Sequence, residues 1–219
     1  MGASTENLES RLLSAFAGSN PVRRSLYPQI INKPAGPETA VEDICPAHGE
    51  KMKVNLYMAI SANGMIAKEN DDTSWISKEE WNSYSAFVRK IGAMIIGRRT
   101  YKILTKQPEF VELKNVTIVV VSHNELKTLS QNHLLAKSPQ DALQLLKDFK
   151  EVAVAGGGIL NGSFIKEGLV DEIILDIEPV LFGKGIPLFG NIDCEANLKL
   201  LDVKKISENE LQVRYKVVK

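Results

Sequence analysis

The chain has 219 residues, of which 44% are hydrophobic and 25% charged, and its formal net charge is zero. This length and composition predict one medium domain with a full core and an appended segment. The charge balance argues against a dedicated nucleic-acid or membrane-surface binder, and the lack of a long apolar run or of metal-spaced cysteines leads us to expect a cytoplasmic protein without membrane, nucleic-acid or metal partners.

The first 51 residues differ in composition from the rest of the chain. They hold five of the nine prolines, and only residues 8–16 show weak helical patterning. We expect residues 1–51 to be a poorly structured extension, whether a partner-docking arm, an added leader or a weak targeting segment. Met52 begins the run MKVNLYMAIS, so the folded domain is predicted to cover residues 52–219.

From residue 53 onward, strand and helix patterns alternate as in an α/β domain. Ser77 is the predicted N-cap of the first helix, with Glu80 at the third helical position of a capping box. The strands are expected at 53–60, 93–96, 116–121 and 151–155, and the helices at 77–91, 98–104, 139–149 and 161–166.

The C-terminal part contains strands without long helices between them. Strands are expected at 172–178, 198–206 and 211–218, the last two forming a hairpin. The fold class is therefore α/β, with a mixed, mostly parallel sheet that carries antiparallel strands at its C-terminal end and is flanked by helices.

A run of three glycines, Gly156, Gly157 and Gly158, follows the strand VAVA and precedes a helix. Because glycine has no Cβ, a ligand can approach the main chain closely at these residues. The helix that follows directs its free N–H groups into the turn. The pattern predicts a phosphate or pyrophosphate site, although a tight connection that binds nothing is the alternative. The dinucleotide fingerprint fails, because Asn161 stands where its third glycine belongs.

Two other strand ends carry polar residues. Gly97-Arg98-Arg99-Thr100 follows a buried strand and starts a helix, which predicts an anion pocket, with a solvated helix start as the alternative. Ser122-His123 follows the β-branched strand TIVVV at the sheet edge where α/β proteins bind ligands. Together with the glycines, these turns indicate a nucleotide with several phosphates.

The order of these motifs resembles that of the dihydrofolate-reductase-like superfamily, particularly the branch of the riboflavin-biosynthesis reductase domain, which is the C-terminal domain of the bifunctional deaminase-reductase. The segments that carry the resemblance lie between residues 53 and 218: MAISANGMIA, SWISKEE, IIGRRTY, VVVS, VAVAGGG and EPVLFGKGIPLF. The resemblance implies a three-layer dihydrofolate-reductase-like fold. No deaminase zinc motif is visible, so the chain is not the bifunctional enzyme.

The resemblance also implies NADPH as cofactor. Its pyrophosphate is expected on Arg98, Thr100 and the three glycines, and its adenosine 2′-phosphate near Arg99, Ser122 and His123. Its nicotinamide is expected against Ala59 and the 61–66 loop. The full set of implied cofactor residues is Ala59, Gly64, Ile66, Gly97, Arg98, Arg99, Thr100, Ser122, His123, Gly156, Gly157, Gly158, Ile159 and Leu160.

An acidic residue on the first helix is the implied catalytic group. In dihydrofolate reductases it stands five positions after a tryptophan, and counting from Trp75 gives Glu80, with Glu79 as the neighbouring candidate. The alternative role of Glu80 is that of the capping-box glutamate. Two departures from the family pattern weaken the assignment of a particular substrate. The threonine that partners the acidic residue in folate enzymes falls at or near Leu175, and the Asp-Asp-Pro run of riboflavin-pathway reductases is replaced by Lys106-Gln107-Pro108.

The sequence thus predicts an NADPH-dependent reductase that transfers hydride to a pteridine or dihydrofolate-like heterocycle, or to a pyrimidine-type riboflavin precursor such as a ribosylaminouracil phosphate. The alternatives are a reductase for another small carbonyl or imine, and a non-catalytic NADPH sensor or partner-binding module; flavin binding is disfavoured but left open. A homodimer is expected, because the apolar content of residues 170–177 and 181–189 predicts an exposed β surface and because the branch resemblance implies one.

Overall fold

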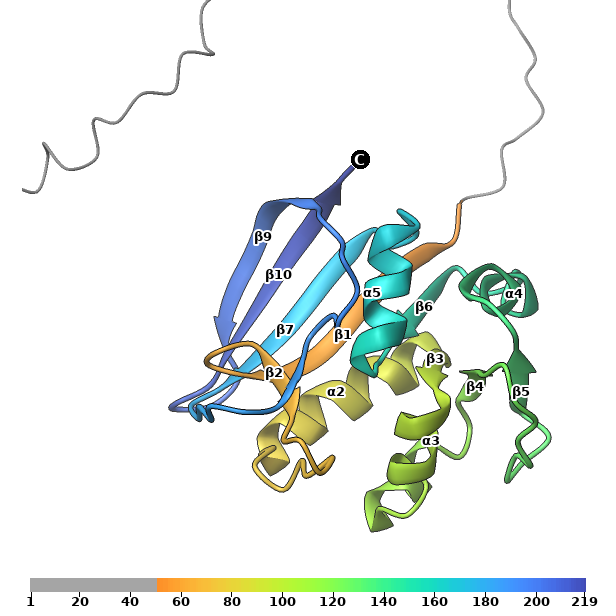
Figure 1. The fold of residues 1–219 in the computed structure, drawn as a ribbon, viewed down its shortest axis with the longest axis horizontal. Coiled ribbons are helices and arrows are strands. Elements are labelled where there is room, and N and C mark those ends of the chain that lie inside the picture. Colours follow the sequence, from red (N-terminus) through yellow and green to blue (C-terminus); the bar gives the residue numbers. More distant parts are fainter. Residues whose placement is uncertain (1–50) are drawn as a thin grey trace, which may run out of the picture. The chain divides into compact units, whose positions relative to one another are not determined.

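The computed structural model describes residues 51–219, which form an eight-stranded sheet with helices on both faces (Figure 1). The extension predicted for residues 1–51 lies outside the described residues except for Lys51. The strand order is β5-β4-β3-β6-β1-β7-β10-β9, and β2 pairs with β8 in a separate two-stranded sheet.

The elements alternate along the chain much as expected. The strands are β1 (Lys53–Ser61), β2 (Met65–Ala67), β3 (Ala93–Gly97), β4 (Thr117–Val121), β5 (His133–Ala136), β6 (Glu151–Val154), β7 (Glu172–Glu178), β8 (Ile186–Pro187), β9 (Asn197–Lys205) and β10 (Leu211–Val218). The helices are α2 (Lys78–Ile91), α3 (Arg98–Leu104), η2 (Pro108–Leu113), α4 (Pro139–Leu145) and α5 (Gly158–Lys166).

The predicted mixture of parallel and antiparallel pairing is confirmed. Strands β5, β4, β3, β6, β1 and β7 are all parallel to their neighbours, while β10 pairs antiparallel with both β7 and β9. Parallel pairs need crossover connections, which the helices between them supply. The carboxyl ends of six strands therefore lie along one edge of the sheet.

Alternate residues of the central strands serve the two faces of the sheet, as the period of a strand requires. In β3, Ile95 packs with Phe164 of α5 and with α4 on one face. Met94 packs on the other face with Val88 of α2 and Tyr101 of α3. All five side chains are almost fully buried, so the central strands are apolar throughout, and this double coverage is why TIVVV is a β-branched run.

Several elements differ from the prediction. The strands β2, β5 and β8 and the 3-10 helix η2 were not expected, because segments of two to six residues are too short to show a period. Helix α5 begins at Gly158, three residues earlier than predicted, and α4 ends at Leu145 rather than at 149. The earlier start of α5 places two of the three glycines at its N-cap and first turn.

The predicted exposed apolar surface is only partly where it was expected. Residues 172–178 form β7, which lies between β1 and β10 and has buried isoleucines, while Leu181 of the second predicted segment is exposed. All nine residues of the edge strand β9, which was not part of that prediction, are exposed. Its large apolar side chains are 43–54% exposed: Leu198, Leu200, Leu201 and Val203. Such an edge is the kind of surface that proteins cover by association.

None of the helices within residues 51–219 is both long enough and apolar enough to cross a bilayer. The cytoplasmic location stays a prediction.

The packing of α5 generates a stability prediction. A Cβ at Gly162 would lie 2.5 Å from Ile192 Cβ and 2.7 Å from the Phe189 carbonyl oxygen. Gly162→Ala should therefore lower the free energy of unfolding by about 1–3 kcal/mol through overpacking, although the same change in an open helix stabilises by about 1 kcal/mol. Urea unfolding measures this, with Lys166→Ala on the exposed face as control. A stabilised Gly162→Ala variant would contradict the close packing.

Candidate functional site

A cavity of about 1260 Å³ opens at the carboxyl ends of the parallel strands, between α2, α3 and the first turn of α5. Fourteen of the sixteen residues predicted for the site line it: Ala59, Ile66, Glu80, Gly97, Arg98, Arg99, Thr100, Ser122, His123, Gly156, Gly157, Gly158, Ile159 and Leu160. The structure thus brings together segments that are up to 100 residues apart in sequence, because their strands end at the same edge.

Two predicted residues do not line the cavity. Glu79 of α2 is exposed and does not line the cavity, so of the two candidates for the catalytic acid only Glu80 faces it. Gly64 has φ +82° in the turn between β1 and β2, where its carbonyl oxygen accepts a hydrogen bond from Leu188 N at 3.1 Å. Gly64 therefore shapes the connection and is not placed to contact a ligand.

The two phosphate-type turns are joined to each other. Gly97 N donates to the Gly156 carbonyl oxygen at 2.7 Å, which ties the end of β3 to the glycine turn after β6. A Cβ at Gly157 would lie 3.2 Å from Thr100 Oγ1, so the two turns touch. The peptide bond between Gly156 and Gly157 is cis.

Arg98 is the cation that lacks a partner in this part of the cavity. Its Nε is buried and makes no hydrogen bond within residues 51–219. A buried guanidinium N–H without an acceptor is costly, and an anion in the cavity would satisfy it. Arg99 differs, because Asp71 of the loop before α2 already accepts from its Nε at 2.6 Å.

A third polar wall is formed where β4 and β5 end. Ser122 Oγ donates to the Asn124 carbonyl oxygen at 2.8 Å, and Lys137 Nζ donates to the His123 carbonyl oxygen at 3.2 Å. Lys137 lines the cavity but was not predicted. It follows β5, and because that strand was missed, nothing in the sequence placed Lys137 beside His123.

The capping-box role predicted as the alternative for Glu80 is wrong. Ser77 Oγ does accept from Glu80 N at 2.9 Å, but Ser77 N donates to Glu178 Oε1 at 2.7 Å. The partner that a capping box requires for the Glu80 carboxyl is therefore taken by a residue of β7. The Glu80 carboxyl makes no hydrogen bond to the described part of the chain, and it faces the cavity although the residue is only 4% exposed.

A buried hydrogen-bond network joins Tyr57, Asp176 and Gln212 in the neighbourhood of Glu80. Tyr57 Oη donates to Asp176 Oδ2 at 2.6 Å, and Gln212 Nε2 donates to Asp176 Oδ1 at 2.7 Å. Asp176 is fully buried on β7, next to Leu175, where the partner threonine of folate enzymes was expected. Leu175 packs instead against the core cluster that contains Ile95 and Phe164.

Burial raises the pKa of Glu80 to about 8, with further contributions from the nearby negative charges of Asp176, Glu178 and Glu210. Burial also raises the pKa of Asp176 and of Glu178 above their usual range. Glu80 is therefore a protonated acid at neutral pH, and it can donate a hydrogen bond or a proton into the cavity.

Aromatic side chains of α2 complete this end of the cavity. Trp81 and Tyr84 line it, while Phe87 stacks at 5.0 Å against Tyr57 in the core. Trp81 and Tyr84 offer flat apolar walls suited to a ring. Among residues 51–219, no group of three or more His, Cys, Asp or Glu side chains could hold a metal ion.

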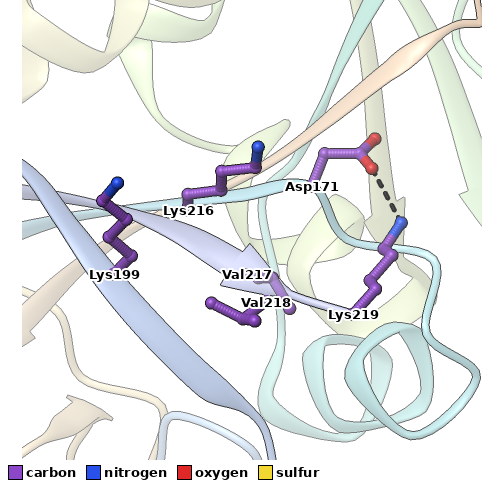
Figure 2. A pocket seen from close by; sticks show the side chains of 6 residues that line it. All are labelled: Asp171, Lys199, Lys216, Val217, Val218 and Lys219. Atoms are coloured by element: carbon purple, nitrogen blue, oxygen red, sulfur yellow. Dashed lines mark hydrogen bonds and ion pairs between the residues drawn. The ribbon is translucent and has the colours of Figure 1, made fainter. Parts of the chain in front are cut away.

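A smaller hollow of about 420 Å³ lies at the opposite edge of the sheet, where β7 begins and β10 ends (Figure 2). It is lined by Lys199, Lys216 and Lys219 around Asp171. Lys219 Nζ donates to Asp171 Oδ1 at 2.7 Å, and Val54 N donates to Asp171 Oδ2 at 3.0 Å. These bonds connect the C-terminal end of the chain to β1 through Asp171, so we interpret the residues of this hollow as structural.

The comparisons with known proteins agree with this geometry. Residues 52–211 match the family model of the RibD C-terminal domain. The chain is 32% identical to YwjB of Bacillus subtilis over 171 residues, which cover 74% of this chain and 97% of YwjB.

Two solved structures share the fold. RibD of Acinetobacter baumannii superposes with a TM-score of 0.63 at 18% identity, over 76% of this chain and 58% of RibD. The dihydrofolate reductase of Enterococcus faecalis, complexed with NADP(H), superposes with a TM-score of 0.60 at 17% identity, over 75% of this chain and 96% of the reductase.

The buried Glu80 generates a prediction for stability against pH. Its folded-state pKa of about 8 lies above the unfolded value of 4.5, so between these values the folded state binds more protons. The free energy of unfolding should then fall as pH rises, by on the order of 1 kcal/mol per pH unit from this group. Urea unfolding at pH 5, 6.5 and 8 should show Glu80→Gln gaining stability relative to wild type as pH rises; Glu79→Gln is the exposed control. Parallel pH profiles for wild type and Glu80→Gln would contradict the raised pKa.

Proposed function

This chain belongs to the RibD C-terminal domain family, a family of reductase type with the dihydrofolate-reductase-like fold, and we propose that it is an NADPH-dependent reductase of a pteridine-like or pyrimidine-type heterocycle. The observation that carries the proposal is that one cavity is lined both by Arg98, whose buried Nε has no acceptor within residues 51–219, and by Glu80, whose carboxyl is protonated. The first suits an anionic cofactor, and the second suits the substrate.

The residues at the joined turns fit the phosphates of NADPH. Arg98 offers a buried N–H that lacks an acceptor, Thr100 lies beside Gly157, and the first turn of α5 offers free backbone N–H groups. Lys137 and His123 belong to the third polar wall. The cationic Lys137 there would face the adenosine 2′-phosphate of the cofactor. When bound, NADPH supplies a hydride.

The size of the cavity supports a second ligand. A volume of about 1260 Å³ exceeds that of most single-ligand sites, about 300–1000 Å³, so cofactor and substrate can occupy it together. Trp81 and Tyr84 can contact the faces of a flat ring. Glu80 can hydrogen-bond the nitrogen atoms of that ring at its edge.

Glu80 supplies the proton that accompanies the hydride. Reduction of a ring C=N bond adds hydride to carbon and a proton to nitrogen, and the Glu80 carboxyl can donate this proton directly. The carboxylate that remains is then reprotonated from solvent, which its raised pKa favours. Tyr57 also lines the cavity, and its hydroxyl donates to Asp176, which does not line it.

The geometry favours an enzyme over a non-catalytic NADPH sensor. If the Glu80 carboxyl only capped α2, no acid would remain on the substrate side of the cavity and a sensor would be favoured. The backbone N–H of Ser77, which a capping Glu80 would bind, instead donates to Glu178. A buried carboxyl without a protein partner is expensive to maintain, and catalysis gives it a use.

We also propose that the protein is a homodimer that covers β9. A nine-residue exposed edge strand with four apolar side chains resembles an unpaired interface. A second copy of the strand could pair with it and bury these residues.

Arg98→Ala should weaken NADPH binding about ten- to hundredfold, because a charge-assisted hydrogen bond contributes about 1.5–3 kcal/mol. Titration of the purified chain with NADPH and with NADH, followed by cofactor fluorescence, measures this. Arg214→Ala is the matched control, since Arg214 pairs with Glu172 far from the cavity. Wild-type protein that binds neither cofactor, or Arg98→Ala with unchanged affinity, would sink the cofactor assignment.

Leu200→Glu should convert the dimer to a monomer, because it places a charge in the middle of the covered strand. Light scattering after size-exclusion chromatography measures the mass. Leu181→Glu, which changes a 73% exposed leucine outside β9, is the control and should remain dimeric. A monomeric wild type would refute the proposal.

A further inference from the structure

The second arginine of the 97–100 turn is tied to the opposite wall of the cavity. Asp71 lies in the 68–74 loop between β2 and α2, and Arg99 lies in the first turn of α3. Asp71 Oδ2 is 2.5 Å from Arg99 Nη2 and 2.6 Å from its Nε. Because both residues line the cavity, this ion pair joins two of its walls.

The two neighbouring arginines therefore meet an incoming anion in different states. Arg98 has a buried Nε without an acceptor. The Arg99 side chain is 69% exposed and already satisfied by Asp71, whose side chain is 23% exposed. An exposed pair of this kind contributes only about 0.2–1 kcal/mol, so the more highly charged phosphates of a cofactor can displace the carboxylate.

We infer that Asp71 is a further determinant of cofactor binding, which competes with the cofactor's phosphates for Arg99 and so lowers their affinity. While no anion is bound, the same ion pair holds the 68–74 loop against α3. When a phosphate takes Arg99, Asp71 is released. The inference rests on the proposed cofactor, but it concerns a residue that neither the sequence motifs nor the glycine turn indicate.

The 68–74 loop has internal bonds that do not depend on the ion pair between Asp71 and Arg99. Asp71 N donates to the Lys68 carbonyl oxygen at 3.0 Å, and Lys68 Nζ pairs with Asp72 Oδ2 at 2.8 Å. Ser74 N donates to Asp72 Oδ1 at 2.9 Å. None of these bonds involves the Asp71 carboxylate, so its loss changes the partner of Arg99 and leaves the loop folded.

Asp72 provides a matched control in the same loop. It carries the same charge and also lines the cavity, but it pairs with Lys68 and not with Arg99. A general effect of negative charge near the cofactor would appear in both Asp71→Asn and Asp72→Asn. Competition for Arg99 would appear in Asp71→Asn alone.

The test is a fluorescence titration of the full chain with NADPH at low and at moderate salt. Asp71→Asn should bind about two- to fivefold more tightly than wild type, which corresponds to the usual free energy of an exposed ion pair. The gain should shrink with added salt and should vanish in the Arg99→Gln background. Asp72→Asn should change affinity equally with and without Arg99→Gln.

An Asp71→Asn variant with wild-type affinity overturns the inference. So does a gain that persists when Arg99 is replaced, because the effect would then not pass through that residue. Both results leave the proposed function standing if wild type binds NADPH. A wild-type chain that binds neither NADPH nor NADH overturns the proposed function as well, so the two failures are distinguishable.

Discussion

The hydrogen bond from Ser77 N to Glu178 decides what the acidic end of the cavity can do. It joins the end of β7 to the start of α2 and uses the donor that a capping-box glutamate would take. Ser77 caps the backbone N–H of Glu80, while the Glu80 carboxyl has no hydrogen-bond partner in the described part of the chain. The same contact brings Glu178 and Asp176 close enough to disfavour ionisation of Glu80, so a position required for helix capping also presents a protonated acid.

The cavity is organised by charge at its two ends. At one end, the bond between Gly97 and Gly156 joins two strand-to-helix turns, next to which Arg98 Nε has no acceptor within residues 51–219. At the other end, burial keeps the proton on Glu80. A cofactor with several phosphates and a neutral ring with hydrogen-bonding nitrogens are complementary to this separation. The central strand β1, which contributes Ala59 to the lining, lies between the two ends.

The fold was largely readable from patterns. Strand runs that are buried on both faces, glycine turns and helix caps are local features, and they placed seven strands and four helices within a few residues of their observed positions. Strand β5 was not readable, because its four residues show no distinct period and no glycine turn follows them, unlike the equally short β6. That omission hid Lys137, because its place beside His123 depends on the register of β5 with β4.

By itself, the sequence determined the α/β fold, the position of the two glycine- and arginine-containing turns and the identity of the acidic candidate, because strand ends, glycines and helix starts are encoded in consecutive residues. Only the tertiary structure decided the role of each side chain. Whether Glu80 caps a helix depends on Glu178, almost 100 residues away, and whether Arg99 is available to a phosphate depends on Asp71 across the cavity. A polar group can make only a few hydrogen bonds or ion pairs, so the role of a polar residue depends on which partners the folded chain places beside it.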